Sequence, residues 1–289
     1  DPDAGAVDDP EDPEGASHGT HVAGTAAAQG GNGIGVVGVC WDDVKILPVR
    51  VLGGGGGTSQ MIIDGLDFAR QQGADVVNMS YGFGIPGLGD EAQRQKMAEL
   101  SAAGVILVAA AGNSAADLAA PAMYDECIAV ASVGPTDAIA PYSSYGPGNE
   151  VDIAAPGGDS TMGYDANIWS TVVTWPEGNV SYGYAGAGWQ GTSMAAPCVA
   201  GAAALLLSAG VPASEVRDRL INSARPPQSG DLDRRKYGAG ILDVQGAMAS
   251  ASIKIIQPTK GGIVSSKPDF RIATSGVMIT SIKVYLDYS

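Results

Sequence analysis

The sequence predicts an α/β domain of three layers, in which helices cover both faces of a mostly parallel central sheet. Three observations support this prediction. Short β-rich runs alternate with helical stretches over most of the chain. The runs are continuously apolar, as expected for parallel strands that are buried on both faces. The chain has 289 residues, which is long enough for one large domain and an additional segment.

The expected strands and helices follow one another in turn, and this order favours a parallel sheet. The expected strands are Val44–Leu52, Asp75–Met79, Val105–Ala110 and Cys127–Val133. The expected helices are His21–Ala28, Gln60–Gln72, Glu91–Ala103, Met194–Ser208 and Ala213–Ser223.

The composition divides the chain into three parts. Residues 1–17 carry seven acidic residues and no basic residue, and prolines break them, so we expect a solvated loop. Residues 18–252 carry the alternating pattern. Residues 253–289 are expected to hold part of an immunoglobulin-like or fibronectin-like β-sandwich, because short apolar runs there alternate with turn residues. The expected strands of this part are Ile253–Ile256, Gly262–Ser265, Phe270–Thr274 and Ile279–Leu286.

Charge and hydropathy exclude several classes of function. The chain has 31 acidic and 16 basic residues, which gives a formal net charge of -15. Such a surface repels phosphate backbones and argues against nucleic-acid binding. The hydrophobic fraction of 45% argues against a disordered chain. No apolar run reaches the roughly 18 residues of a membrane-spanning helix, so no membrane partner is expected.

The three cysteines, Cys40, Cys127 and Cys198, cannot all pair within one chain. Two interpretations stay open. The thiols are small buried side chains, or one disulfide forms beside a free thiol, which would indicate an oxidising compartment.

The segment GTSMAAP at residues 191–197 places Ser193 at the start of an apolar helix. There a serine hydroxyl lies beside free backbone N–H groups and the positive end of the helix dipole, where an oxyanion is stabilised. An ordinary serine or threonine helix cap is the alternative.

The segment HGTHVAG at residues 18–24 begins another helix of small residues and contains both histidines of the chain. His18 and His21 could act as a metal pair, as two structural side chains, or as the source of a general base for Ser193. A metal pair is disfavoured because the chain has no third histidine and no HExxH motif.

Two further segments have competing interpretations. Asn113 follows a buried strand, so its side-chain amide could donate into a site, or it could simply favour a turn. Gly33, Gly35 and Gly38 match the spacing of a dinucleotide-binding loop. That loop must follow a strand and open a helix, whereas here it follows a helix and precedes a strand-like run, which argues against nucleotide binding.

Together, these segments resemble the subtilisin-like serine proteases, the subtilases, from His18 to about Met248. Residues 76–82 and 151–157 also resemble segments of that family. The resemblance implies a subtilisin-like fold and a secreted serine endopeptidase of broad specificity. The implied partner is a protein or peptide substrate, and we expect a monomer.

By this resemblance, Ser193 is the nucleophile and His18 is the base and acid, while His21 packs. Asn113 and the Ser193 backbone N–H would hold the oxyanion. A glycine run would pair with the substrate backbone, and two further segments would line the primary specificity pocket. The glycine run is Gly55, Gly56 and Gly57, and the pocket residues are Ser80, Tyr81, Gly82, Ala110, Ala111 and Gly112.

The segment QGGNGIGV at residues 29–36 resembles the calcium loop of the family. The implied Ca²⁺ ligands are the side-chain or backbone oxygens of Gln29, Asn32, Ile34 and Val36. A glycine-rich turn that binds no metal is the alternative.

The chain departs from the family pattern at the catalytic aspartate, which should end an apolar strand upstream of the histidine. Residues 1–17 contain no apolar run. We therefore expect a chain truncated before that strand, with an upstream segment or pro-region that supplies the aspartate, and little activity in this chain alone. The alternative is a catalytically incomplete homologue that binds peptides or serves as a structural module.

Overall fold

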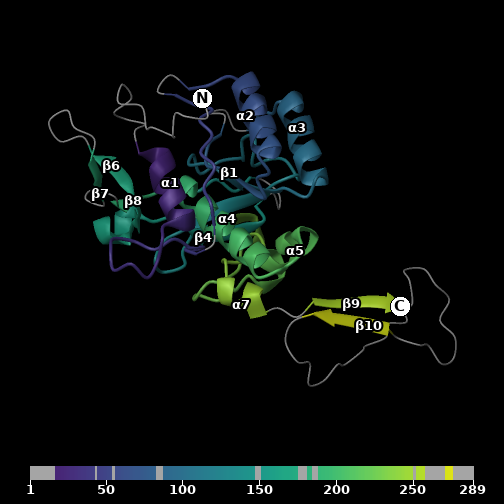
Figure 1. The fold of residues 1–289 in the computed structure, drawn as a ribbon. Helices are drawn as coiled ribbons and strands as arrows, with labels where there is room; N and C mark the ends of the chain where they lie inside the picture. The colour runs from purple at the N-terminus through teal and green to yellow at the C-terminus, as the bar shows by residue number, and fades with distance from the viewer. Residues whose placement is uncertain are drawn as a thin grey trace.

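The centre of the molecule is a four-stranded sheet in which all neighbours are parallel, as expected (Figure 1). The computed structural model describes residues 17–42, 44–53, 56–82, 87–146, 151–174, 181–183, 188–249, 252–257 and 271–275. The strand order is β1-β2-β3-β4. The strands are β1 (Val76–Met79), β2 (Ile106–Ala110), β3 (Ile128–Val133) and β4 (Ile153–Pro156).

Helices cover both faces of this sheet, which confirms the three layers. Along β2, Ile106, Val108 and Ala110 pack in one core cluster with the apolar side of α4 (Thr192–Ser208). The alternate residues Leu107 and Ala109 pack in a second cluster, which includes side chains of the two helices on the opposite face. This period of two follows from side chains that point alternately to the two faces of a strand. The two helices are α2 (Ser59–Gln71) and α3 (Glu91–Ala102).

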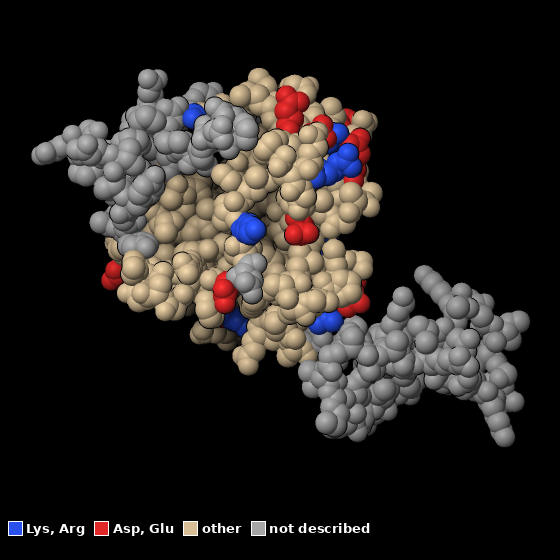
Figure 2. All heavy atoms as spheres, in the orientation of Figure 1, with Lys and Arg blue, Asp and Glu red and all other residues tan. Residues whose placement is uncertain are grey.

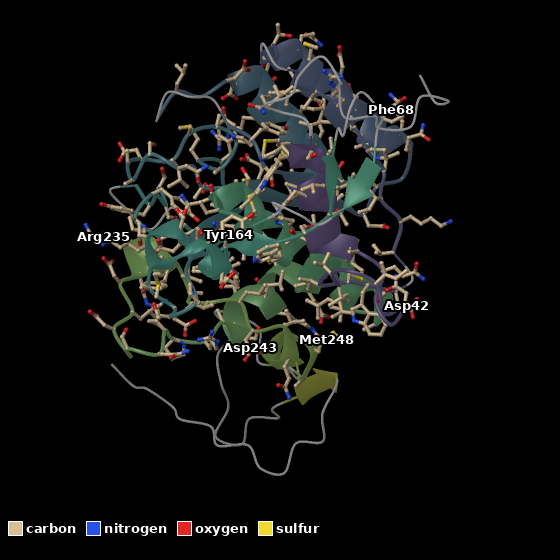
Figure 3. The ribbon with its side chains drawn as sticks, turned by 90° about the vertical axis from the view of Figure 1, so that its left-hand side faces the viewer. Asp42, Phe68, Tyr164, Arg235, Asp243 and Met248 are labelled. Carbon is tan, nitrogen blue, oxygen red and sulfur yellow. The ribbon has the colours of Figure 1, made fainter. Side chains whose placement is uncertain are left out.

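Three other helices, α1 (His18–Ala27), α5 (Ala213–Ser223) and α7 (Val244–Ala249), lie in the α4 layer, and each contacts α4. Asp243 caps the short helix α7, where its Oδ1 accepts a hydrogen bond from Gly246 N at 2.8 Å (Figure 3). The other short helices are α6 (Arg234–Tyr237), η1 (Ser160–Met162) and η2 (Tyr164–Ala166).

Two small antiparallel strand pairs lie between β4 and α4 in the sequence. The pair of β5 (Ile168–Trp169) and β8 (Gly188–Trp189) lies beside α1. The second pair is β6 (Val172–Thr174) and β7 (Ser181–Gly183). The sequence analysis predicted neither pair, because two- and three-residue strands carry no measurable periodicity.

The prediction of a strand at Val44–Leu52 is wrong. The segment is not a strand in the structure, and no strand within the described part of the chain pairs with it. Ile46 and Leu47 are 49% and 40% exposed, while Val51 and Leu52 pack against the core. Apolar composition favours an extended backbone, but a strand also needs a hydrogen-bonded neighbour. The prediction also omitted β4 as a strand.

The C-terminal part contains β9 (Ser252–Gln257) paired antiparallel with β10 (Arg271–Ser275). These strands correspond to two of the four predicted there. The predicted strands Gly262–Ser265 and Ile279–Leu286 lie outside the described residues, as does the acidic segment 1–16. The division of the chain into three parts therefore stays a prediction.

All three cysteine side chains are buried thiols outside any disulfide, as the first of the two interpretations expected. Burial raises the pKa of the Cys198 thiol to about 12. Charged residues of both signs gather over α2 and α3 (Figure 2), where Lys96 contacts Asp67 and Glu99. Among the described residues, no helix combines the length and apolar character needed to cross a membrane.

Candidate active site

Ser193 lies in the first turn of α4 and is joined to the end of β1 by two reciprocal hydrogen bonds. Its Oγ donates to Ser80 O at 3.2 Å, and Ser80 Oγ donates to Ser193 O at 2.8 Å. The second bond has a local cause. Pro197 is four residues after Ser193 and has no N–H, so it cannot make the helical hydrogen bond to the Ser193 carbonyl. The Ser80 hydroxyl fills this position.

Thr192 fixes the orientation of the Asn113 side chain. Asn113 Oδ1 accepts hydrogen bonds from Thr192 N and Thr192 Oγ1, both at 2.9 Å. Thr192 Oγ1 in turn accepts from Gly112 N at 3.1 Å. Because Oδ1 is occupied by two donors, the Asn113 amide nitrogen is the atom that remains for a ligand beside Ser193. It faces Gly191, where an added Cβ would lie 3.5 Å from Asn113 Nδ2.

Helices α1 and α4 are in contact and run in parallel, because Trp189, just before α4, lies beside His18 and His21, whereas Gly201 farther along α4 lies beside Ala26 farther along α1. An added Cβ at Gly201 would lie only 2.7 Å from Ala26 O, which locates one close contact of the two helices. Ala26 is eight residues after His18, and Gly201 is eight residues after Ser193. At 1.5 Å per residue, both side chains lie about 12 Å back from this contact. The register therefore brings His18 and Ser193 to one end of the helix pair.

Trp189 joins the two helix starts. Its ring stacks on His21 with centroids 4.9 Å apart, and its centroid lies 6.5 Å from that of His18. Trp189 immediately precedes the turn that leads into α4. His21 itself is fully buried, as its expected packing role requires.

The segment before β6 holds the backbone of α1. Ser170 Oγ donates to His21 O at 2.6 Å, and Thr171 Oγ1 donates to Thr20 O at 2.7 Å. Gly24 lets these residues approach, because an added Cβ there would lie 2.2 Å from Thr171 Oγ1. The position of His18 thus depends on hydroxyl groups that the sequence analysis did not identify.

A pocket of about 240 Å³ opens beside Ser193. Of the predicted wall residues, five line it, whereas Ser80 does not and is hydrogen-bonded to Ser193 instead. The other lining residues come from the loop after β2, from position 144 and from the start of α4. The full lining is Tyr81, Gly82, Ala110, Ala111, Gly112, Asn113, Ser114, Asp117, Ala119, Ser144, Thr192 and Ser193.

Two buried hydroxyl groups near the site stay neutral. Burial raises the pKa of the Tyr81 phenol well above its usual value. Burial also raises the pKa of Tyr142 to about 12. The Tyr142 hydroxyl lies 2.9 Å from Gly157 O, and the same carbonyl accepts Gly191 N at 2.9 Å. Tyr142 therefore supports the turn from which α4 begins.

The predicted glycine run is only partly described, since Gly55 lies outside the described residues. Gly56 N donates to Gly53 O at 2.8 Å, and Gly53 N donates to Gly56 O at 3.1 Å. These bonds close a tight turn, for which the φ of +85° at Gly56 requires a glycine. Gly57 is exposed next to this turn.

The predicted calcium loop is an exposed turn in which Gly31, Gly33 and Gly35 all have positive φ. Asn32 Oδ1 accepts a hydrogen bond from Ile34 N at 2.9 Å. This amide oxygen keeps a second lone pair, and the other candidate ligands in the loop are neutral oxygens. The ligand type fits Ca²⁺. Among the described residues, no group of three or more His, Cys, Asp or Glu side chains could hold a metal.

Comparison with known proteins identifies the family. The sequence profile described as the subtilase family matches residues 1–240. Subtilisin DY from Bacillus licheniformis is 38% identical over 242 residues, which cover 81% of this chain and 78% of that protein. The extracellular basic protease of Dichelobacter nodosus is 35% identical over 91% of this chain. The chain spans only about half of that relative, 46% of its length.

Solved structures agree with the sequence comparison. A protease from Pseudoalteromonas arctica superimposes with a TM-score of 0.69 at 37% identity, covering 80% of this chain and 69% of that one. A lanthipeptide protease superimposes with a TM-score of 0.64 at 25% identity, covering 80% and 74%. With the fold, the three sequence segments and these likenesses in agreement, the chain belongs to the subtilase family of serine endopeptidases.

Proposed function

We propose that Ser193 is the nucleophile of a peptide-bond hydrolysis for which His18 is the general base and acid. The observation that supports this assignment is the parallel register of α1 and α4. It brings both residues to one end of the helix pair, beside a pocket of about 240 Å³ that Ser193 lines. A serine and a histidine at a pocket edge suit acyl transfer.

The reaction begins when the Ser193 hydroxyl turns from Ser80 O toward the His18 imidazole. Ser193 Oγ then attacks the substrate carbonyl while His18 takes its proton. Asn113 Nδ2 and the Ser193 N–H donate to the oxyanion, and the N-terminus of α4 adds its positive dipole. His18 next gives its proton to the leaving amine, and water releases the acyl group by the reverse sequence of proton transfers.

The third member of the triad stays a prediction. The catalytic aspartate is expected in an upstream segment, and residues 1–16 lie outside the described part of the chain. The relatives favour an enzyme over a catalytically incomplete homologue. The kcat of this chain should therefore rise when an upstream apolar strand ending in aspartate is added, by up to about 10⁴-fold. Equal kcat values would contradict the missing-aspartate hypothesis.

A fluorophosphonate probe tests the nucleophile directly. We expect the probe to label Ser193, as read by peptide mass spectrometry, and to leave Ser193→Ala and His18→Ala unlabelled. Ser208→Ala, at the other end of the same helix, is the matched control and should label normally. Labelling of Ser193→Ala at the wild-type rate would refute the assignment of the nucleophile.

Substrate binding is proposed to combine backbone pairing with one side-chain pocket. Gly55, Gly56 and Gly57 would pair with an extended peptide, and the two described glycines, Gly56 and Gly57, are both exposed. Tyr81, Gly82 and Ala110–Gly112 would contact the side chain that precedes the scissile bond. Pairing to backbone is independent of side chains, which supports a broad specificity.

Calcium is proposed as a structural ligand of the loop that contains Gln29, Asn32, Ile34 and Val36. When bound, the ion would cross-link the loop and contribute stability rather than chemistry. EDTA should lower the melting temperature of the wild type, and Ca²⁺ should restore it. Asn32→Ala should melt at one temperature with or without Ca²⁺. A response of Asn32→Ala equal to the wild type would exclude this loop as the site.

We also propose that the protein is secreted and acts as a monomer. The name of the relative from Dichelobacter nodosus describes an extracellular protease. Export of the full gene product to the medium, and elution as a single 29.0 kDa species for this chain, are the expected observations.

A further inference from the structure

The pocket beside Ser193 is lined in part by an acidic residue, Asp117, which the sequence analysis did not identify. Its lining is otherwise made of small residues, hydroxyl groups, one amide and the Tyr81 ring. Of these lining residues, Asp117 alone carries a charge at neutral pH, because burial keeps the Tyr81 phenol protonated. The pocket therefore presents one negative charge and no positive charge.

The chain fold explains how Asp117 reaches this pocket. The loop after β2 passes from Asn113 through Ala115, which has a positive φ of 51°, and returns to the core at Leu118. Backbone hydrogen bonds fix the loop on both sides of Asp117. Tyr145 N donates to Ala116 O at 3.0 Å, and Gly87 N donates to Leu118 O at 2.9 Å.

The Asp117 carboxylate is not used to stabilise the fold. It is exposed, and within the described part of the chain no hydrogen bond or ion pair engages it. Asp137 differs in this respect, because both of its carboxylate oxygens accept hydrogen bonds from Arg225. An uncommitted carboxylate on a pocket wall is available to a ligand with a cationic group.

We propose that Asp117 is a specificity-determining residue that favours substrates with lysine or arginine immediately before the scissile bond. This inference rests on the proposed function, because Ser193 defines which peptide bond the pocket adjoins. The alkyl part of such a side chain packs along Tyr81 and Ala110–Gly112, while its cationic end lies near Asp117. The net charge of -15 also attracts cationic peptides over longer distances.

The expected preference is modest because Asp117 is exposed. Exposed ion pairs of this type change kcat/KM by roughly two- to fivefold. The inference therefore adds a bias to a broad specificity and does not replace it. The bias should also weaken at high salt, where the Debye length falls to about 3 Å at 1 M.

Paired peptides that differ only at this position provide the test, with the chain extended by the upstream segment that carries the catalytic aspartate. One carries lysine before the scissile bond and the other carries norleucine, which has a similar length and no charge. For the wild type we expect the kcat/KM ratio of lysine to norleucine to exceed that of Asp117→Asn by roughly two- to fivefold at low salt. Asp117→Lys should lower the ratio further. Asp218→Asn on α5 makes the same charge change away from the pocket lining and should leave the ratio at the wild-type value.

The outcomes separate this inference from the proposed function. If Ser193 is labelled by the fluorophosphonate probe and both peptides are cleaved, but Asp117→Asn leaves the ratio unchanged, the role of Asp117 is wrong and the protease assignment stands. If Asp218→Asn changes the ratio as much as Asp117→Asn, the effect is one of overall charge and the role is again wrong. If the chain extended by the upstream segment that carries the aspartate cleaves neither peptide and Ser193 is not labelled, both proposals fail.

Discussion

The two helices that carry the proposed catalytic residues are held in different ways. Helix α4 buries 12 of its 17 residues, whereas α1 buries three of its 10. Apolar packing against four strands holds α4, and reciprocal bonds to Ser80 add to it. Helix α1 contacts α4 on one side and is tied by the hydroxyl groups of Ser170 and Thr171 on another.

This difference predicts how substitutions near each of the two helices will affect the protein. Small apolar residues let α4 lie deep in the core, so its position is set by many contacts at once. The position of α1 depends on a few polar contacts and one close helix crossing. We therefore expect substitutions around α4 to act on chemistry and global stability, and substitutions around α1 to act mainly on the placement of His18.

The largest expected effect is on the α4 side of the site, at Asn113. Asn113→Ala should lower kcat by about 10²–10³-fold with little change in KM, because it removes a donor to the oxyanion; this range is the one known for such a donor in a subtilisin. Steady-state kinetics on one peptide would measure this effect. Asn222→Ala, an exposed asparagine on α5, is the control. A loss that falls mainly on KM would contradict the oxyanion role.

The next effect tests the crossing of the two helices. Gly201→Ala places a Cβ within 2.7 Å of Ala26 O and 2.9 Å of Val39 Cβ, so backbone must move. We expect a loss of about 1–3 kcal/mol in the free energy of unfolding, measured by urea denaturation. Gly19→Ala is the matched control, since no atom lies within 4 Å of an added Cβ there. Equal stability of the two variants would mean that the crossing is not tightly packed.

A smaller effect is expected where α1 is tied by hydroxyl groups. Ser170→Ala removes the hydrogen bond to His21 O and should cost about 1 kcal/mol of unfolding free energy. If α1 is the weakly held half, kcat should fall by more than this stability loss alone predicts, since the folded fraction stays near unity. An unchanged kcat at full folding would indicate that α1 is held well enough without Ser170.

The smallest effect concerns an ion pair that is remote from α1. The hydrogen bond from Arg225 lowers the pKa of Asp137 below its usual value. A carboxyl with a depressed folded pKa stabilises the protein above its unfolded pKa, and this contribution is lost as the pH falls below about 4. Asp137→Asn should lower the melting temperature by at most about 2–4 °C at pH 7, with a smaller difference at pH 3. A difference that grows toward pH 3 would contradict this assignment.

The sequence predicted the elements with strong local signals. The start of α4 was expected at Met194 and lies at Thr192, and the end at Ser208 agrees. The parallel sheet also agrees, because continuous apolar runs distinguish buried strands. Val44–Leu52 shows the limit of this signal, since an apolar extended segment is a strand only if another strand pairs with it.

The parts of the site that escaped prediction depend on contacts between distant segments. Ser170 and Thr171 reach α1 across about 150 residues of sequence, with separations of 149 and 151. Asp117 follows Asn113 by four residues, but only the path of the loop shows that it lines the pocket. A serine, a threonine or an aspartate in a loop carries no periodic signal, so such roles need the folded structure.

The proline in α4 has a consequence for how the site withstands mutation. By withholding one amide, Pro197 transfers the anchoring of the Ser193 carbonyl from the helix to the sheet. If α4 frays at its far end, near Ser208, the hydrogen bond from Ser80 still holds the Ser193 carbonyl in place. The position of Ser193 is therefore set by the sheet, and residues farther along α4 can change without moving it.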